Sequence, residues 1–467
     1  MSDQSIQASL QAVTESAFQG QIGVATVDIT PPVGIYARNW GAAKHDVADS
    51  IHRRLTLNAL VLYAAGAEQP LIFLDADLGW WRSLITFKRF QSRLLEELEI
   101  NESALIFGLS HTHASPPLTD PDPDLPASDS LAEYLETVYQ ACLVAVREAI
   151  KNVAAAVLEW KTGHCQLAAM RDLPDPSPEA ERIICGWNPG EPADDTLVVG
   201  RISDASGTLK AVIVNYACHP TTLAWDNTAI SPDYPGAMRD TIQETLGVPA
   251  LFMQGASGEL APRYQYVGDT EVADLHGRQL AYATLATLED MEPAATCLEY
   301  QGVMESGAPL AVWRHAAVKP SSLLKALELK VELPLKDWPS AEELEQQRAA
   351  CTDRALEERL RRRRNIRRGI GDGSTLDLPI WVWRIGDTIL VGSPTEAYSI
   401  LQRELRKRFP ERTIVCLNLI NGTTGYLTPA ELYDLDLYQV WQTPFERGGL
   451  EILIEGMADA IRQMTAE

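Results

Sequence analysis

Three histidines stand directly after runs of apolar and β-branched residues, where strands commonly end. The run LIFGLS leads into His111 and His113, and the run VIVNYAC leads into His219, which precedes a proline. Side chains two residues apart on an extended chain point to the same face, so His111 and His113 can converge on one point. Such a pair commonly binds a divalent metal, or combines one ligand with one polarising donor. The alternative is that each imidazole is a structural group satisfied by the backbone around it.

Two carboxylates lie in polar turns that also follow apolar runs. Asp233 belongs to ISPDYPG (230–236), and Glu259 belongs to FMQGASGELAP (252–262). Small residues after a strand allow the backbone to approach a ligand closely, so Asp233 and Glu259 are candidate substrate-binding residues. The alternative is that each segment is only a tight turn. The second turn is not a phosphate-binding loop, because it lacks the GK[ST] sequence, and the chain has no GxSxG elbow for serine-triad chemistry.

A further candidate segment is found near the C-terminus, in NGTTGYLTPAELYDLDLYQ. Its tyrosines, Tyr426, Tyr433 and Tyr438, follow Asn-Gly and Thr-Gly pairs, so they are expected in a loop and not on a periodic core face. The alternative is that they pack against the protein with their hydroxyls at the surface.

The elements that must position these groups alternate along the chain. Strands are expected at 22–30, 57–65, 70–78, 103–113, 209–219, 249–257, 379–392 and 413–422. Helices are expected at 83–99, 130–154, 235–246, 270–290, 396–408 and 448–464. This alternation predicts an α/β fold in mixed α+β layers, with a mixed β-sheet flanked by helices.

One segment, residues 339–369, predicts a single long charged helix that forms an arm on this fold. Ser340 is its expected N-cap, Glu342 and Glu343 lie in its first turn, and eight arginines lie between positions 354 and 368. We interpret it as a solvated helix whose cations complement the dipole at its C-terminal end. The alternative is a binding patch for an anionic partner or a second subunit.

Composition limits the classes of function. The chain has 467 residues, 46% of them hydrophobic, which is enough for a large core and excludes a disordered protein. Its formal charge of −24 disfavours nucleic acid and anionic membrane surfaces as partners. It lacks both an apolar run of the roughly 18 residues that a membrane span requires and a basic N-terminal signal. Its seven scattered cysteines predict reduced thiols, so we expect a cytoplasmic protein without stable membrane association.

Several segments, taken in order, resemble the neutral/alkaline non-lysosomal ceramidase family, most closely its short bacterial relatives that carry only the catalytic domain. The matching segments are VDITPPVG (27–34), KHDVADSIHRRL (44–55), SHTHASP (110–116), GWNPGEPADD (186–195), NYACHPTTL (215–223), ISPDYPG (230–236), QGASGELAP (254–262) and GYLTPAELYDLDLY (425–438). Because these motifs run through most of the chain and serve one site in the family, the resemblance implies one domain over residues 20–467. The segment 339–369 is then an insertion, and residues 1–19 an N-terminal extension.

The resemblance also implies a zinc hydrolase that acts on an amide bond. His111, His219 and Tyr426 would bind one Zn²⁺, although Fe or Mn also suits such ligands. Tyr438 would hydrogen-bond the reacting oxygen, and His113 would polarise the substrate carbonyl or handle the proton. Arg171 stands where the family has an arginine near the substrate.

Two positions depart from the family pattern. Ser393 stands at the position of the family's glutamate ligand, so the carboxylate must come from Glu396, one helical turn later, or be missing. Ala261 replaces a serine that is important to activity in the family, which leaves metal-activated water as the nucleophile.

These departures and the acidic composition define the expected function. The family's secretion signal and C-terminal β-domain are not found, so a small soluble N-acyl compound is expected in place of long-chain ceramide. The alternatives are a catalytically inactive binding protein and a metal-dependent ester or lactone hydrolase. A homo-oligomer is possible.

Overall fold

The larger of two main sheets has eight strands and lies in the first two thirds of the chain. The structure is a computed structural model that describes residues 16–122 and 125–466. Across the sheet the order is β13 (Ala250–Gln254), β11 (Leu209–Tyr216), β10 (Thr196–Asp204), β6 (Ala154–His164), β1 (Ser16–Asp28), β3 (Thr56–Tyr63), β4 (Leu71–Ala76) and β5 (Leu105–Leu109). Neighbouring strands are antiparallel except at the two edges, where β11 pairs with β13 and β4 with β5 in parallel.

Four helices cover one face of this sheet: α2 (Leu84–Leu98), α3 (Asp129–Lys151), α4 (Tyr234–Leu246) and α5 (Thr270–Glu289). Glycines mark two close contacts on this face, because a Cβ at Gly23 would clash with α3 and a Cβ at Gly163 would clash with Thr287 of α5. The pairing of β1 with β6 places Gly23 and Gly163 on the same side. In α3 the buried side chains recur every three or four residues, which is the spacing of one helix face.

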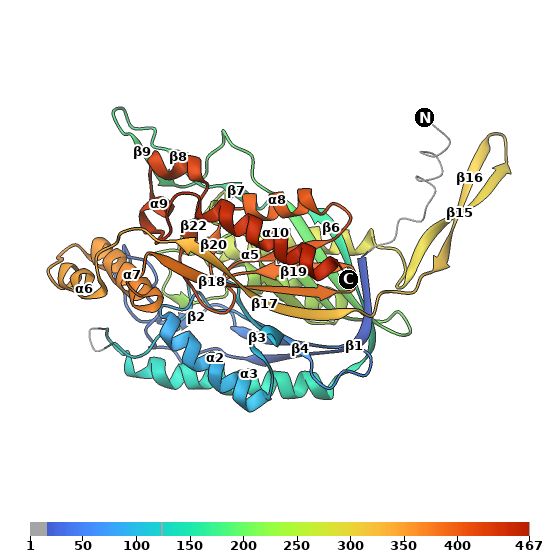
Figure 1. The fold of residues 1–467 in the computed structure, drawn as a ribbon, viewed down its shortest axis with the longest axis horizontal. Helices are drawn as coiled ribbons and strands as arrows, with labels where there is room; N and C mark the ends of the chain where they lie inside the picture. Colours follow the sequence, from blue (N-terminus) through green and yellow to red (C-terminus); the bar gives the residue numbers. More distant parts are fainter. Residues whose placement is uncertain (1–15, 123–124, 467) are drawn as a thin grey trace.

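The second sheet has the order β17 (Leu324–Pro334), β18 (Thr375–Ile385), β19 (Thr388–Gly392) and β21 (Ile414–Leu417). In β18 Trp381 and Trp383 pack into the core of the first sheet, whereas Ile380 and Val382 pack against α8 (Ile400–Arg408) and α10 (Gly449–Thr465). Because alternate side chains of β18 point to opposite faces, this strand contributes to both hydrophobic cores. The layers follow the order helices, sheet, sheet, helices (Figure 1).

The larger sheet curls until its two edge strands, β13 and β5, contact each other. The segment after β21 bonds to both edges. The Asn418 amide donates to the Gln254 carbonyl at the end of β13, and the Asn421 amide donates to the Phe107 carbonyl in β5. The curl matters because residues after β5 and after β11, far apart in the strand order, come to lie side by side.

Short elements complete the described chain. They are β2 (Ser50–Ile51), β7 (Ala168–Met170), β8 (Asp172–Pro174), β9 (Arg182–Cys185), β12 (Ala229–Ile230), β14 (Leu260–Pro262), β20 (Glu396–Ala397), β22 (Tyr426–Leu427), β23 (Asp436–Leu437), α9 (Tyr438–Gln442) and two 3₁₀ turns, η1 (Glu102–Ala104) and η2 (Ala430–Asp434). A hairpin of β15 (Thr296–Glu305) and β16 (Pro309–Ala317) projects from the body (Figure 1).

The charged segment forms two helices, α6 (Ala341–Ala349) and α7 (Arg354–Ile370), so the prediction of one helix over 339–369 is wrong. Ser340 caps α6 as predicted, in a capping box with Glu343. The helix α6 ends at Ala349, and a second N-cap follows it. The Asp353 carboxylate accepts the Leu356 amide, so a new helix, α7, begins at Arg354. The prediction of a solvated helix is also wrong for α7, in which Glu358, Arg361, Arg364 and Arg367 are buried.

The predicted α/β fold in mixed layers is confirmed, with several corrections to its elements. The predicted strand 379–392 is a hairpin of β18 and β19, and the predicted helix 396–408 begins only at Ile400, since Glu396 lies in strand β20. Residues 16–19 belong to β1 and not to an N-terminal extension, and residues 1–15 lie outside the described residues. Among the described residues, no helix combines the length and the apolar character that crossing a membrane requires.

Candidate metal centre

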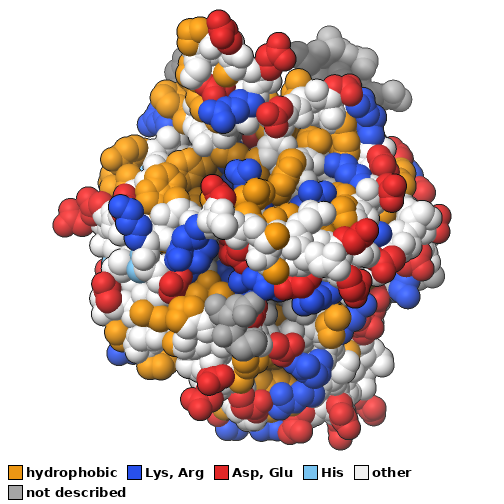
Figure 2. Space-filling model, turned by 90° about the vertical axis from the view of Figure 1, so that its left-hand side faces the viewer, with side chains coloured by type: hydrophobic (Ala, Val, Ile, Leu, Met, Phe, Trp, Pro, Cys, Tyr) orange, Lys and Arg blue, Asp and Glu red, His pale blue; other side chains and the backbone are white. Residues whose placement is uncertain are grey.

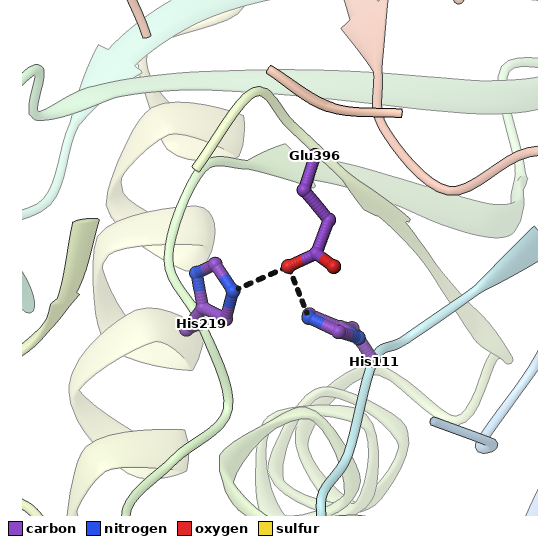
Figure 3. Close-up of side chains that lie close together, drawn as sticks. All are labelled: His111, His219 and Glu396. Carbon is purple, nitrogen blue, oxygen red and sulfur yellow. Dashed lines mark hydrogen bonds and ion pairs between the residues drawn. The ribbon is translucent and has the colours of Figure 1, made fainter. Parts of the chain in front are cut away.

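Three buried side chains meet where strands of both sheets end. His111 follows β5, His219 follows β11, and Glu396 lies in β20, just after β19. Glu396 Oε2 lies 3.3 Å from His111 Nε2 and 3.1 Å from His219 Nε2 (Figure 3). One ligand atom from each residue can be chosen so that all three lie within 4.8 Å of one another, which suits a single metal ion.

Backbone carbonyls determine which nitrogen of each histidine carries the proton. His111 Nδ1 donates to the Gly79 carbonyl at 3.1 Å, and His219 Nδ1 donates to the Ser257 carbonyl at 2.6 Å. Since a carbonyl can only accept, both Nδ1 atoms are protonated, and in the neutral imidazoles both Nε2 lone pairs face the Glu396 carboxylate. Three acceptors directed at one point repel one another unless a cation lies between them, and carbonyl-bound Nδ1–H groups are the usual support for ligating histidines.

The protonation states agree with this arrangement. Burial, followed by the positive charge of Arg171, lowers the pKa of His219 to about 3. Burial raises the pKa of Glu396, whereas hydrogen bonds and positive charge from His111 and His219 in their protonated forms hold that pKa well below its usual value, which is the effect of a positive charge at this point. A neutral imidazole and an ionised carboxylate are the forms that bind metals.

Tyr426 lies beside Glu396 because β20 and β22 pair in parallel, with these two residues directly opposite. Arg171 donates to the Gly258 carbonyl at 2.7 Å and lies 3.3 Å from both the Tyr426 hydroxyl and His219 Nε2. Burial raises the pKa of Tyr426 well above its usual value, whereas the Arg171 charge acts in the opposite direction. The structure therefore brings all four expected ligands together, with Arg171 behind Tyr426 and His219.

His113 lies next to this cluster, with its ring centroid 4.9 Å from that of His111. The rings of Trp40 and Trp80 flank it at 5.2 and 4.9 Å. Both of its ring nitrogens are buried without a hydrogen-bond partner among the described residues. Burial, with the nearby histidines, lowers its pKa well below the usual value, so His113 is a neutral imidazole with its polar atoms free for a ligand.

A narrow pocket opens over the cluster, with a cavity volume of about 50 Å³. His111, His113, Glu396, Tyr426 and Tyr438 line it. The Tyr438 hydroxyl lies 3.4 Å from Arg362 Nη1, and its ring centroid lies 5.8 Å from that of Tyr426. Tyr438 thus lines the pocket beside Tyr426.

Several pocket residues were not identified from the sequence. They are Trp80, Trp81, Arg82, Glu358, Arg361, Arg362, Asn365, Ile366, Thr423, Gly425 and Gln442. Trp80 and Trp81 follow β4, which was predicted as a strand and which pairs in parallel with β5. Their position after the end of a strand could therefore have indicated that they lie near the site. The arginine-rich helix was singled out for its charge, but no local pattern distinguishes its pocket face from its other faces. Thr423 lies in the candidate segment NGTTGYLTPAELYDLDLYQ, of which only the tyrosines were singled out, and nothing in the sequence marked Gln442.

Asp233 and Glu259 are not brought into this pocket. The Asp233 carboxylate caps α4 through the Tyr234 amide and also accepts the Leu223 amide. The Glu259 carboxylate accepts the Ser399 amide at 2.9 Å and the Ser399 hydroxyl at 2.5 Å. Burial raises the pKa of Asp233 to about 6 and that of Glu259 to about 7. Both carboxylates face protein donors, so their contacts are structural and do not support the expected role in substrate binding.

The two departures from the family pattern are both buried. Ser393 is buried, and its hydroxyl lies 2.8 Å from that of Thr395, while Ala261 lies in β14 without a reactive group. Glu396 is the carboxylate that reaches the histidines, from a strand and not from the helical turn that the sequence suggested.

Comparisons with known proteins give a match in structure alone. No protein-family model and no curated protein sequence matches the chain. Among solved structures, a ceramidase complexed with C2 superposes with a TM-score of 0.67 at 16% identity, covering 97% of this chain and 76% of that chain. The neutral ceramidase from Pseudomonas aeruginosa superposes with a TM-score of 0.65 at 17% identity, covering 97% of this chain and 75% of that chain. The chain therefore has the fold of these ceramidases.

Proposed function

We propose that this chain is a metal-dependent hydrolase of amide bonds and a distant relative of the neutral ceramidases whose fold it shares. The observation that carries the proposal is the buried cluster of His111, His219 and Glu396. Two Nε2 lone pairs and a carboxylate oxygen converge there, and two backbone carbonyls hold the imidazoles in the ligating tautomer. A structural role alone does not explain why three acceptors should converge in the core.

The donor set favours zinc. Two imidazoles, a carboxylate and the nearby Tyr426 phenol are donors that would suit Zn²⁺, and Fe or Mn are the competing ions. When bound, the ion would supply Lewis acidity, which polarises a carbonyl and lowers the pKa of water to about 7.

The chain's own residues supply positioning and hydrogen bonds. Tyr438 directs its hydroxyl into the pocket beside Arg362, where it can donate to an oxygen that gains negative charge. His113 is a neutral imidazole with both nitrogens unpaired among the described residues, so one nitrogen can donate a hydrogen bond to the substrate carbonyl and the other can accept one. Arg171 is a positioning residue, because it contacts Tyr426 and His219 and does not line the pocket.

Metal analysis of the purified protein tests the proposal. We expect about one equivalent of zinc in the wild type and its loss in His219→Ala, because that variant removes a ligand and leaves the rest of the site intact. His164→Ala is the matched control, since His164 is exposed and pairs with Asp195 at the surface. A chelator should lower the melting temperature of the wild type and of His164→Ala, but not that of His219→Ala.

Hydrolysis assays complete this test. Release of amine from small N-acyl amides, measured on the zinc-loaded protein, should exceed hydrolysis of the matched esters relative to their uncatalysed rates. A fully stable wild type that binds no metal would overturn the proposal. Bound zinc without turnover of either amides or esters would favour a binding protein instead.

A further inference from the structure

One end of the pocket is rich in arginine although the protein as a whole is acidic. Figure 2 shows the molecule from the side of α6 and α7, where basic and acidic side chains are interspersed with hydrophobic ones. From this side α7 contributes Arg361 and Arg362 to the pocket, and Arg82 comes from the loop before α2. The Arg362 guanidinium lies over the Trp80 ring at 5.0 Å, and Trp80 contacts His111 and His113. The arginines are thus adjacent to the metal-binding cluster.

The arginines at this end are paired unequally with carboxylates. Arg361 is neutralised by Glu357 and Asp122. Arg362 and Arg82, in contrast, have one carboxylate between them in the part of the chain that the structure describes. Glu358 lies 3.1 Å from Arg362 Nε and 3.9 Å from Arg82 Nη2. Two guanidinium groups therefore share one negative charge at this end of the pocket.

Polar atoms without partners line the same cavity. Both polar atoms of the Gln442 amide and the Thr423 hydroxyl are buried without a hydrogen bond among the described residues, as is Arg82 Nε. Gln442 is 3% exposed and Thr423 9% exposed, so bulk solvent has little access to them. A buried donor or acceptor without a partner costs roughly 1–3 kcal/mol of stability. A ligand with matching polar atoms would remove this cost, so these atoms favour a polar ligand.

An alkyl chain satisfies none of these groups. If a long acyl or sphingoid chain filled this end, it would leave the guanidinium charge desolvated and the Gln442 and Thr423 atoms unpaired. Sites built from buried polar groups discriminate strongly against ligands that lack the matching atoms. A planar carboxylate, in contrast, accepts from a guanidinium through two oxygens and can also take a hydrogen bond from an amide or a hydroxyl.

We propose that the substrate is a compact amide that carries a carboxylate close to the scissile bond, and that Arg362 is the residue that selects it. This inference rests on the proposed amide hydrolysis, since the same pocket serves both. The carboxylate pairs with Arg362 and Arg82, Gln442 and Thr423 bind the polar atoms beside it, and the scissile carbonyl lies at Tyr438 and His113. The carboxylate belongs either to the amine side, as in N-acyl amino acids, or to the acyl side, as in monoamides of dicarboxylic acids.

Matched substrates that differ by the carboxylate test the proposal. N-acetylphenylalanine and N-acetylphenethylamine differ only by a carboxylate on the amine side, and N-succinyl- and N-propionylphenethylamine differ only by a carboxylate on the acyl side. We expect zinc-loaded wild type to prefer the charged member of one pair by about 10- to 100-fold in kcat/KM, the range of a charge-assisted contact. The pair with the larger preference identifies the side that carries the carboxylate.

Arg362→Gln should collapse that preference by at least tenfold. A merely structural or catalytic role of Arg362 would lower both members of a pair equally and leave their ratio unchanged, so the ratio is the decisive quantity. Arg362→Lys keeps a positive charge beside Glu358 and guards against misfolding, and it should give an intermediate ratio because it loses the planar fork. Arg368→Gln removes the same charge from an exposed position of α7 and should leave the ratio unchanged.

Binding without turnover separates this inference from the proposed function. Calorimetry on metal-free protein with N-acetylphenylalanine and N-succinylphenethylamine should detect binding of the preferred anion that Arg362→Gln weakens about tenfold. Arg362-dependent binding without any hydrolysis would contradict the proposed function and leave the anion site standing. Hydrolysis with equal or better rates for the neutral amides, or a ratio unaffected in Arg362→Gln, would overturn the inference and leave the proposed function intact.

Discussion

His111 and His219 each use one ring nitrogen to bond a backbone carbonyl, and this contact decides the chemistry that the other nitrogen can do. His111 also has a φ of 70°, a conformation that non-glycine residues rarely adopt. Its backbone amide donates to the Leu78 carbonyl, so the strained residue is held from both its backbone and its ring. Strain of this kind persists where the surrounding structure over-determines it, most often at functional sites.

Tyr438→Phe is the residue-scale prediction. The variant keeps the ring that packs against Tyr426 and removes the hydroxyl that lies beside Arg362. If the hydroxyl stabilises negative charge in the transition state, kcat should fall by about 10²–10³-fold with little change in KM. Steady-state kinetics on the preferred amide measure the effect, together with zinc content, which should stay at the wild-type value.

Tyr433→Phe is the control for this variant. The Tyr433 hydroxyl donates to the Phe445 carbonyl at 3.0 Å and does not line the pocket. Its removal should leave kcat within about twofold of the wild type, as for most substitutions away from a site. If Tyr438→Phe raised KM and left kcat unchanged, its hydroxyl would bind the substrate and not the transition state.

The helix α7 and the hairpin of β15 and β16 differ in how much they contribute to the site and to the stability of the fold. The helix α7 is held to the body by ion pairs of Arg354 with Asp46 and of Arg361 with Asp122. It puts Arg361 and Arg362 into the pocket, so it is part of the site. The hairpin of β15 and β16 instead projects from the body, and nearly all of its residues are exposed or partly exposed. The exposed ones include Val303, Met304 and Trp313. A two-stranded hairpin gains little stability by itself, so the fold does not depend on this one.

Shortening the hairpin is the element-scale prediction. Glu299 and Arg314 are direct partners across the two strands, so residues 300–313 can be replaced by Asn-Gly, which favours a two-residue turn. We expect the free energy of unfolding to change by less than about 1 kcal/mol and zinc content to stay constant, because no core side chain is lost. Denaturant unfolding and metal analysis measure both quantities.

Size-exclusion chromatography of the same variant tests a second role. The hairpin's exposed apolar side chains would be buried if copies of the chain associated through it. A wild-type oligomer that becomes monomeric on shortening would show that the hairpin is an intersubunit contact. A loss of several kcal/mol in a monomeric protein would contradict the prediction and show that the hairpin supports the core.

At the scale of the whole molecule, one asparagine joins the second sheet's connecting segment to the edge of the first sheet. The Asn421 side chain accepts the Phe107 amide at 2.7 Å and donates to the Leu105 carbonyl at 2.8 Å. These two hydrogen bonds are the ones that a neighbouring strand would make at the edge of β5. Phe107 lies two residues before the end of this strand. Its φ of 51° lies in a region where asparagine is enriched.

Asn421→Ala is the prediction at this scale. The variant leaves two buried backbone groups of β5 unpaired, so the free energy of unfolding should fall by about 2–4 kcal/mol. Zinc affinity should fall as well, because His111 follows β5 directly. Asn152→Ala is the control, since its side chain makes one exposed hydrogen bond to the Val24 carbonyl and should cost less than about 1 kcal/mol. Equal losses in the two variants would contradict this role of Asn421.

Local patterns carried the predictions that succeeded. Helices α2, α3, α4, α5 and α10 lie within a few residues of their expected ranges, because a 3.6-residue period is legible without knowledge of the rest of the chain. The capping box of Ser340 and Glu343 is equally local. The strands β6, β10, β15, β16 and β17 were missed, and most of them carry charged or small residues that weaken the alternation.

The sequence by itself determined the chemistry that is available: histidines at strand ends, a carboxylate near position 396, two tyrosines in a loop and an arginine-rich segment. Only the tertiary structure decided which of these meet. His111 and His219 follow strands near opposite edges of the sheet, and they meet because the sheet curls and residues 418–421 bond both edges. Arg362 reaches the pocket because Asp353 starts a second helix, which packs beside α2. These contacts join residues distant in sequence, and no local period or propensity encodes them.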